Sequence, residues 1–282
     1  GEGTLDDVAD VIRAVAATAV MPRFGALLAS EVTGKGVDDI VTVADIEAEE
    51  MLTERLGRIR PGLPVLGEEA CSTDPGLRHR VQDEGTYWVV DPLDGTREFV
   101  AGRSGFGLMA ALVVDGETAA AWIHLPATGR LYDGARGLPV RRDGHPMPAP
   151  APGRQQGSAP VRGYALTSLA PPDVRAPLEA RQRELPDRFE PGPPAAAVAY
   201  TSMLEGRLGF GFYWRTEPWD HAPGALLVQL AGGRSARLDG RPYLPADDSS
   251  GLLVTTDGDQ WRVVHDDLML PGGSSPPTAR DC

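Results

Sequence analysis

The fold of this 282-residue chain follows from one stretch, Trp88-Val89-Val90-Asp91-Pro92-Leu93-Asp94-Gly95-Thr96-Arg97-Glu98-Phe99. Its first residues are apolar and β-branched, which predicts a buried strand. Pro92 is expected to end that strand, because its ring removes a backbone donor. Gly95 permits a tight turn, and Thr96 is expected to be the N-cap of a short helix. Two carboxylates at a strand end beside a helix N-terminus suit divalent cations next to a phosphate.

Composition narrows the class of protein. The 41% hydrophobic content supports one large domain or two closely packed ones. The net charge of −13 argues against nucleic acid as the main partner. No stretch approaches the roughly 20 apolar residues that span a bilayer, and the first residues do not resemble a signal peptide. Cys71 and Cys282 are the only cysteines, which excludes a disulfide framework and a cysteine-zinc site and favours the reducing cytoplasm.

Hydrophobic spacing and turn residues predict the elements of the first half. A helix is expected from about residue 4 to 29, opened by a Thr4–Asp7 capping pattern and bent near Pro22. Thr42 and Asp45 form a second capping pattern, at the start of the next helix. Further strands are expected at Val65-Leu66, at 106–114 and 118–124 as a hairpin through Asp115-Gly116, at Leu131-Tyr132 and at Val140-Arg141.

The second half alternates strands and helices. Residues 146–160 are rich in Pro, Gly and Ala and are expected to form a linker. Strands are expected at 164–167, 208–213 and 252–254, and helices within 172–184, 195–204 and 218–230. We therefore predict an α+β half, residues 1–150, packed on an α/β half, residues 151–282.

Four places along the chain carry acids with an unusual context: Glu68 after a short strand, Asp91 and Asp94 around the Leu93 carbonyl, Asp220 in the first turn of a helix, and Asp45. Hard cations such as Mg²⁺ take carboxylate and carbonyl oxygens gathered from separate elements. Two such ions can clamp an in-line displacement, one activating water and the other stabilising the leaving oxygen.

Each of these residues also has a structural interpretation. Asp45 fits the carboxylate of a capping box, Thr96 an N-cap, and Asp220 a partner for a helix dipole. Glu68 fits a solvated pair with Glu69. The spacing of Asp91 and Asp94 excludes an EF-hand loop. The joint occurrence of the four places favours the chemical interpretation.

Three motifs resemble those of the inositol monophosphatase-like superfamily of Mg²⁺-dependent, lithium-sensitive phosphatases. They are Gly67-Glu68-Glu69, Asp91-Pro92-Leu93-Asp94-Gly95-Thr96 and Trp219-Asp220-His221-Ala222-Pro223-Gly224, in matching order and spacing. The resemblance implies a five-layer αβαβα sandwich, of the inositol monophosphatase and fructose-1,6-bisphosphatase type. It also implies hydrolysis of a small phosphate monoester, commonly by a homodimer.

The same resemblance implies a role for each matching residue. Glu68, Asp91 and the Leu93 carbonyl would bind one Mg²⁺. Asp91, Asp94 and Asp220 would bind a second, and Glu68 would reach a third through water. Asp45 and Thr96 would orient and deprotonate the attacking water, the backbone N–H groups of Gly95 and Thr96 would hold phosphate, and Lys35 would lie in a loop that covers the site.

The residues expected to select the substrate differ from those of the inositol phosphatases that the chain resembles. Those enzymes carry a hydroxyl residue near position 195 and a glutamate on the strand before the third motif, where this chain has Pro194-Ala195-Ala196 and Tyr213-Trp214-Arg215. The aromatic pair and Arg215 would stack a ring or meet a second anionic group, or the two aromatics belong to the core. The alternatives are a 3′(2′),5′-bisphosphate nucleotidase, which shares the Asp94–Phe99 form, and a histidinol-phosphate phosphatase. A non-catalytic regulatory protein is a further alternative, disfavoured by the complete ligand set.

Overall fold

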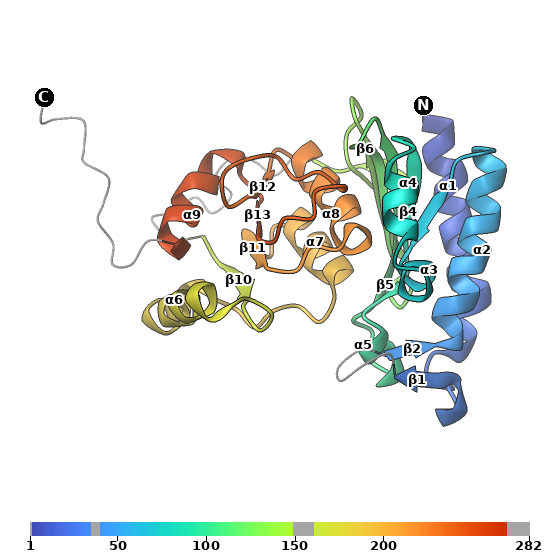
Figure 1. Ribbon diagram of the computed structural model, residues 1–282, viewed down its shortest axis with the longest axis horizontal. Coiled ribbons are helices and arrows are strands. Elements are labelled where there is room, and N and C mark those ends of the chain that lie inside the picture. The colour runs from blue at the N-terminus through green and yellow to red at the C-terminus, as the bar shows by residue number, and fades with distance from the viewer. Residues whose placement is uncertain (1, 35–39, 149–160, 270–282) are drawn as a thin grey trace, which may run out of the picture.

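The computed structural model describes residues 2–34, 40–148 and 161–269 (Figure 1). Its helices are α1 (Glu2–Val15), α2 (Val43–Ile59), α3 (Glu68–Thr73), α4 (Leu77–Gln82), α5 (Thr96–Val100), α6 (Pro172–Glu184), α7 (Ala196–Leu204), α8 (Pro218–Leu230) and α9 (Trp261–Met269). Its strands are β1 (Val32–Gly34), β2 (Ile40–Thr42), β3 (Val65–Gly67), β4 (Tyr87–Asp94), β5 (Gly107–Val114), β6 (Glu117–Leu125), β7 (Arg130–Ala135), β8 (Arg141–Arg142), β9 (His145–Pro146), β10 (Gly163–Leu166), β11 (Phe210–Tyr213), β12 (Arg234–Arg237) and β13 (Leu252–Thr255).

Five layers follow one another across the molecule (Figure 1). Helices α1 and α2 cover one face of a seven-stranded sheet with the order β3-β4-β5-β6-β7-β8-β9. Helices α7 and α8 separate its other face from a four-stranded sheet with the order β10-β11-β13-β12, and α6 and α9 cover the far face of that second sheet. The predicted five-layer αβαβα architecture is confirmed.

Strand β4 lies inside the large sheet and is buried on both faces. Trp88 and Val90 belong to the core under α1 and α2, whereas Tyr87 and Val89 belong to the core under α7 and α8. Alternation sends successive side chains to opposite faces, and apolar layers on both sides explain why the strand reads as a continuous apolar run. The core under α7 and α8 draws its side chains from both predicted halves of the chain.

The prediction that Pro92 ends the central strand is wrong. Strand β4 continues to Asp94, and its pairing with β5 shifts register between Asp91 and Asp94. Strand β3 ends opposite Val90, so Pro92 lies beyond the part of β4 that β3 pairs with. A local irregularity next to a strand end accommodates a residue without an N–H, and it turns the two aspartates toward the same edge.

The first helix is shorter than predicted. After α1 the chain widens into a π-helical segment at Ala16–Val20 and then tightens into a 3₁₀ turn at Met21–Arg23. It leaves the helix where Phe24 becomes extended. The predicted capping role of Thr4 is also wrong, because Thr4 lies inside α1. The hairpin prediction is confirmed: Asp115 and Gly116 join β5 to β6 with φ of 51° and 76°, as a two-residue turn requires.

Some predictions fall outside the described residues. These include Lys35, most of the expected linker at 146–160, and Cys282. The division of the chain at residue 150 falls there too and stays a prediction. Within the described residues, no helix is both long and apolar enough to cross a membrane.

Candidate active site

Two parallel strands deliver acids to one edge of the large sheet. Strands β3 and β4 pair with Gly67 opposite Val90, so Glu68, directly after β3, and Asp91, within β4, lie at the same level. Asp94 is the last residue of β4. Asp220 comes from the second half of the sequence and lies in the first turn of α8. The carboxylates of Asp91, Asp94 and Asp220 offer oxygens that all lie within 4.8 Å of one another. Three predicted metal ligands from two elements are therefore brought together.

The electrostatics of this cluster favour a cation. Burial, and then the charges of Glu68, Asp94 and Asp220, raise the pKa of Asp91 well above its usual range. Burial raises the pKa of Asp94 to about 6, and burial with the charge of Asp94 raises the pKa of Asp220 to about 8. Like charges crowded out of water repel one another, and a divalent cation between them removes that repulsion. The oxygen donors and their spacing fit a hard cation such as Mg²⁺.

Asp94 has a second function in the fold. Its Oδ2 accepts the backbone N–H of Ala197 at 2.5 Å, in the first turn of α7. Helix α7 has no side-chain cap of its own, because Ala195 occupies the N-cap position. A carboxylate from β4 therefore supplies the missing acceptor and ties the large sheet to the second half of the chain.

Asp45 acts both as a helix cap and as a partner of Thr96. Its Oδ2 accepts the backbone N–H of Thr42 at 2.8 Å and the Thr42 hydroxyl at 2.6 Å, which completes the predicted capping box. Its Oδ1 lies 2.9 Å from the Thr96 hydroxyl. The two interpretations of Asp45 are thus compatible, because each carboxylate oxygen serves one of them.

Thr96 is not the N-cap of α5. It is the first residue of that helix, and Gly95 holds the N-cap position with φ of 85°. The Thr96 hydroxyl lies within hydrogen-bonding distance of Asp45 Oδ1 and, at 3.0 Å, of the Leu93 carbonyl oxygen. The N-cap prediction for Thr96 is therefore wrong, whereas the pairing of Thr96 with Asp45 that the family resemblance implied is present, because the fold brings α2 beside the end of β4.

Glu49 is a residue at the site that sequence reasoning missed. Its carboxylate is buried in α2 and accepts the backbone N–H groups of Glu69 and Ala70, at 2.8 and 2.7 Å. A signal was present in the sequence, since Glu49 follows Asp45 by four residues and so shares its helix face.

The third motif forms a buried aromatic layer behind Asp220. His221 Nδ1 lies 2.9 Å from the Tyr200 hydroxyl, and burial lowers the pKa of His221 to about 3, so the ring is neutral. A Cβ on Gly224 would lie 2.0 Å from Cγ of Tyr200, so this glycine makes room for the tyrosine ring. The motif thus combines a predicted metal ligand, Asp220, with the packing that holds it.

The three predicted substrate contacts in this half separate into two groups. Tyr213 is buried, stacks on Tyr200 with 5.8 Å between ring centroids and bonds to the Tyr164 hydroxyl. Trp214 packs against the core of the second sheet. Arg215 has a side chain that is 57% exposed, and its charge offsets part of the rise in the pKa of the neighbouring Asp220 that burial and Asp94 cause. The structure therefore supports the core interpretation for the aromatic pair and leaves Arg215 facing outward.

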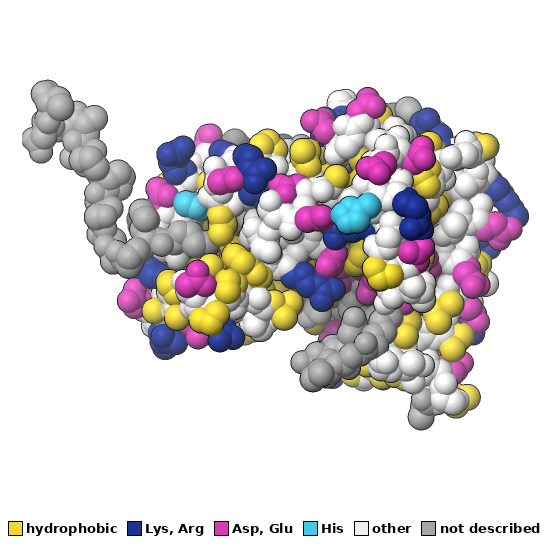
Figure 2. Space-filling model, viewed as in Figure 1, with side chains coloured by type: hydrophobic (Ala, Val, Ile, Leu, Met, Phe, Trp, Pro, Cys, Tyr) yellow, Lys and Arg dark blue, Asp and Glu magenta, His cyan; other side chains and the backbone are white. Residues whose placement is uncertain are grey.

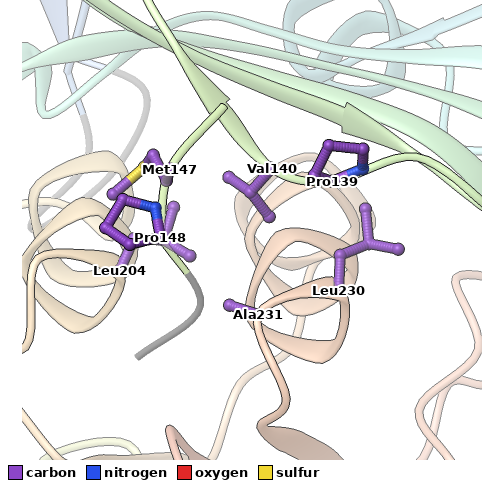
Figure 3. A pocket seen from close by; sticks show the side chains of 7 residues that line it. All are labelled: Pro139, Val140, Met147, Pro148, Leu204, Leu230 and Ala231. Atoms are coloured by element: carbon purple, nitrogen blue, oxygen red, sulfur yellow. The ribbon is translucent and has the colours of Figure 1, made fainter. Parts of the chain in front are cut away.

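A pocket of about 120 Å³ opens elsewhere, where α7 and α8 end near β8 (Figure 3). Its lining consists of Pro139, Val140, Met147, Pro148, Leu204, Leu230 and Ala231. All of these side chains are apolar, so the pocket offers no group for acid–base or metal chemistry.

Comparison with known proteins agrees with this geometry. The sequence model of the inositol monophosphatase family matches residues 4–266. An inositol-1-monophosphatase of Rhizobium meliloti is 32% identical over 77% of this chain and 79% of its own length. A histidinol-phosphatase of Chlorobaculum parvum is 29% identical over 78% of this chain and 84% of its own. Among solved structures, a Thermotoga maritima IMPase shares the fold, with a TM-score of 0.74 at 22% identity over 94% of this chain and 96% of that one.

Replacement of Gly95 by alanine tests how tightly the turn is packed. The new Cβ would lie 2.8 Å from the Gly105 carbonyl oxygen and 2.9 Å from Ala195 Cβ, in addition to the strain of a positive φ. We expect Gly95→Ala to lower the free energy of unfolding by about 2–4 kcal/mol in urea titrations. Gly102→Ala is the matched control, since it shares a positive φ but meets nothing within 4 Å, and about 1 kcal/mol is expected there. Equal losses in the two variants would contradict the close packing at Gly95.

Proposed function

The chain belongs to the inositol monophosphatase family, whose members are phosphatases, and from that premise we propose that it hydrolyses a small phosphate monoester with the help of Mg²⁺. One observation carries the proposal. Three carboxylates from β4 and α8, one buried and two half-buried, converge within 4.8 Å, directly beside a hydroxyl–carboxylate pair formed by Thr96 and Asp45. An uncompensated cluster of this kind costs folding free energy, and its retention is explained by a cation.

The proposed ligands divide into two sets that share Asp91. Glu68, Asp91 and the Leu93 carbonyl would hold one Mg²⁺, and Asp91, Asp94 and Asp220 would hold a second. Glu68 would take part in a third, weaker site. After burial, the charge of Glu68 raises the pKa of Asp91 more than the charge of Asp94 or Asp220 does. This proximity to Asp91 supports the place of Glu68 in the first set.

The bound ions would lower the pKa of a water molecule and stabilise the charge that develops on the leaving oxygen. The residues of the chain would handle the proton. The Thr96 hydroxyl donates to Asp45 Oδ1 at 2.9 Å, so Thr96 Oγ1 can accept a proton from water as its own proton passes to Asp45. Burial raises the pKa of Asp45, which makes the carboxylate a better base near neutral pH.

The turn at Gly95 would bind the phosphate. The backbone N–H groups of Gly95 and Thr96 lie at the beginning of α5, where the amide dipoles favour an anion. Orientation of the phosphate by these groups, with water at Thr96 on one side, would produce the in-line geometry that the reaction needs.

Two observations bear on the substrate. Tyr213 replaces the acid expected of inositol phosphatases, and it is buried with its hydroxyl on Tyr164. Arg215 is exposed beside Asp220 and would attract a second anionic group. A substrate with two phosphates, such as a 3′(2′),5′-bisphosphate nucleotide, is therefore a second candidate. Histidinol phosphate carries an ammonium group that Arg215 would repel.

Two further features are proposed from the family resemblance and the composition. A homodimer in the cytoplasm would fit the family habit and the two cysteines of the chain. Sedimentation velocity of the purified protein would test the dimer.

A substrate screen with an Asp94→Asn control tests the function. We expect Mg²⁺-dependent release of phosphate from at least one of inositol, sugar, histidinol and bisphosphate nucleotide substrates. Asp94→Asn should lower kcat/KM by about 100-fold or more, because a metal ligand loses its charge. The asparagine oxygen can still accept the Ala197 N–H, so the fold should persist. Mg²⁺ should raise the melting temperature of the wild type more than that of the variant. Near-normal activity of Asp94→Asn, or no hydrolysis of any substrate by the wild type, would contradict the proposal.

Asp45→Asn separates catalysis from metal binding. Asparagine can keep one acceptor for the Thr42 cap but is a poor base toward Thr96, so kcat should fall by about 100-fold. The Mg²⁺ concentration for half-maximal activity should change by less than twofold. A parallel loss of Mg²⁺ affinity would make Asp45 a ligand rather than a base.

Arg215→Gln tests recognition of a second anionic group. The side chain is more than half exposed, so the expected effect is modest. KM should rise about fivefold for a bisphosphate nucleotide and stay unchanged for a substrate with a single phosphate. An equal change in KM for both substrates would show that Arg215 does not read the second group.

A further inference from the structure

The carboxylate of Glu49 lies at the start of α3. Although it is a charged residue, only 7% of Glu49 is exposed. Its Oε2 accepts the backbone N–H of Glu69 at 2.8 Å, and its Oε1 accepts the N–H of Ala70 at 2.7 Å. Both oxygens of one buried carboxylate are therefore engaged with two successive amides of a different element.

This contact replaces a missing helix cap. The first N–H groups of a helix have no partner within it, and a side chain at the N-cap position usually accepts from one of them. Gly67 holds that position in α3 and has no side chain to offer. Glu49 supplies the acceptor from α2, about 20 residues earlier in the chain. The negative charge also suits the positive end of the helix.

Gly67, the residue before Glu68, has no room for a side chain because the Glu49 carboxylate occupies that space. Gly67 has φ of −107° and ψ of 154°, a conformation that any residue adopts. A Cβ at this position would lie only 2.3 Å from Cδ of Glu49. The absence of a side chain at Gly67 therefore makes room for Glu49, and the two residues together form the contact between α2 and the start of α3.

The contact between Glu49 and the start of α3 restrains Glu68, which lies between Gly67 and Glu69. On one side of Glu68, strand pairing holds Gly67 opposite Val90 of β4. On the other side, the backbone N–H of Glu69 donates to the Glu49 carboxylate. The backbone of Glu68 is thus restrained on both sides, next to Asp91. One turn earlier on the same helix, Asp45 contacts Thr96. Helix α2 therefore presents one carboxylate to each flank of the site.

We propose that Glu49 is a positioning residue that fixes the Glu68 carboxylate for Mg²⁺ binding. It touches neither cation nor substrate, and it acts through the first turn of α3. The inference rests on the proposed function insofar as the cation is Mg²⁺ and Glu68 is a ligand. Partners that orient metal ligands in this way typically change metal affinity by about 10- to 100-fold when they are replaced.

Glu49→Gln and Glu50→Gln form a matched pair of variants. Both remove one negative charge from neighbouring positions of α2, but Glu50 is exposed. In Glu49→Gln the amide NH₂ faces one of the two backbone N–H groups, so one donor loses its acceptor. Titration calorimetry with Mg²⁺ should show binding about tenfold weaker for Glu49→Gln and unchanged for Glu50→Gln. In activity assays, kcat at saturating Mg²⁺ should stay within about twofold of the wild type while the half-saturating Mg²⁺ concentration rises.

Gly67→Ala reaches the same contact from the other side. Its Cβ should displace the Glu49 carboxylate and weaken Mg²⁺ binding to a similar degree. Because both changes break one contact, the double variant should be no worse than the more severe single variant. Hydrogen exchange should show faster exchange at the amides of Glu69 and Ala70 in all three variants, with the rest of the sheet protected as in the wild type.

The results distinguish this inference from the proposed function. Equal Mg²⁺ affinity for Glu49→Gln and Glu50→Gln, or additive losses in the double variant, would overturn the role of Glu49. A wild type that binds Mg²⁺ but hydrolyses no phosphate monoester would overturn the proposed function, while the calorimetric comparison would still decide the role of Glu49.

Discussion

The repulsion among crowded carboxylates is the constraint on which the rest of this structure depends. Asp91, Asp94 and Asp220 are held within 4.8 Å, with Asp91 only 1% exposed, and each has a pKa raised chiefly by burial. Such a cluster spreads apart unless rigid elements hold it. Strand β4, next to the edge strand β3 of the large sheet, supplies two of the acids, and α8 supplies the third from the layer that packs against the sheet (Figure 1). The packing of the layers therefore holds together acids that would otherwise move apart.

The elements around the cluster are stabilised by the same kinds of side chain that the site uses. Asp45 caps α2 with one oxygen and meets Thr96 with the other, Asp94 caps α7, and Glu49 caps α3. Each carboxylate satisfies backbone N–H groups that would otherwise lack a partner. Over the visible surface, Arg side chains are interspersed with Asp and Glu (Figure 2). The acids around the cluster therefore serve local structure as well as the proposed cation site.

The parts that the sequence predicted are those coded by neighbouring residues. Thr42 with Asp45, and Asp115 with Gly116, each contain the whole of their motif within four residues, and both formed as expected. The local Thr4–Asp7 pattern failed because α1 begins before it, whereas the errors at Pro92 and Thr96 concern tertiary context. Pro92 stays in a strand because β3 ends before it, and Thr96 turns its hydroxyl to α2 instead of capping α5. Glu49 and Gly67 explain each other only once α2 lies against α3, so no local pattern could have paired them.

The side of the site where substrate contacts were predicted is built differently from the side that carries the acidic cluster. Tyr164, Tyr200, Tyr213 and His221 form a closed, neutral aromatic layer, in which hydroxyls and ring nitrogens satisfy one another. Outside this layer, Glu217 accepts both Arg215 and Arg78, and Arg78 also meets Asp248, so the charges alternate in a chain that leads from α4 to the start of α8. A change at Arg215 therefore alters this exposed chain without entering the buried layer that supports Asp220. Under the proposed function, this separation would allow substitutions in the exposed chain of charges to change substrate preference while the buried layer keeps the predicted metal ligands in place.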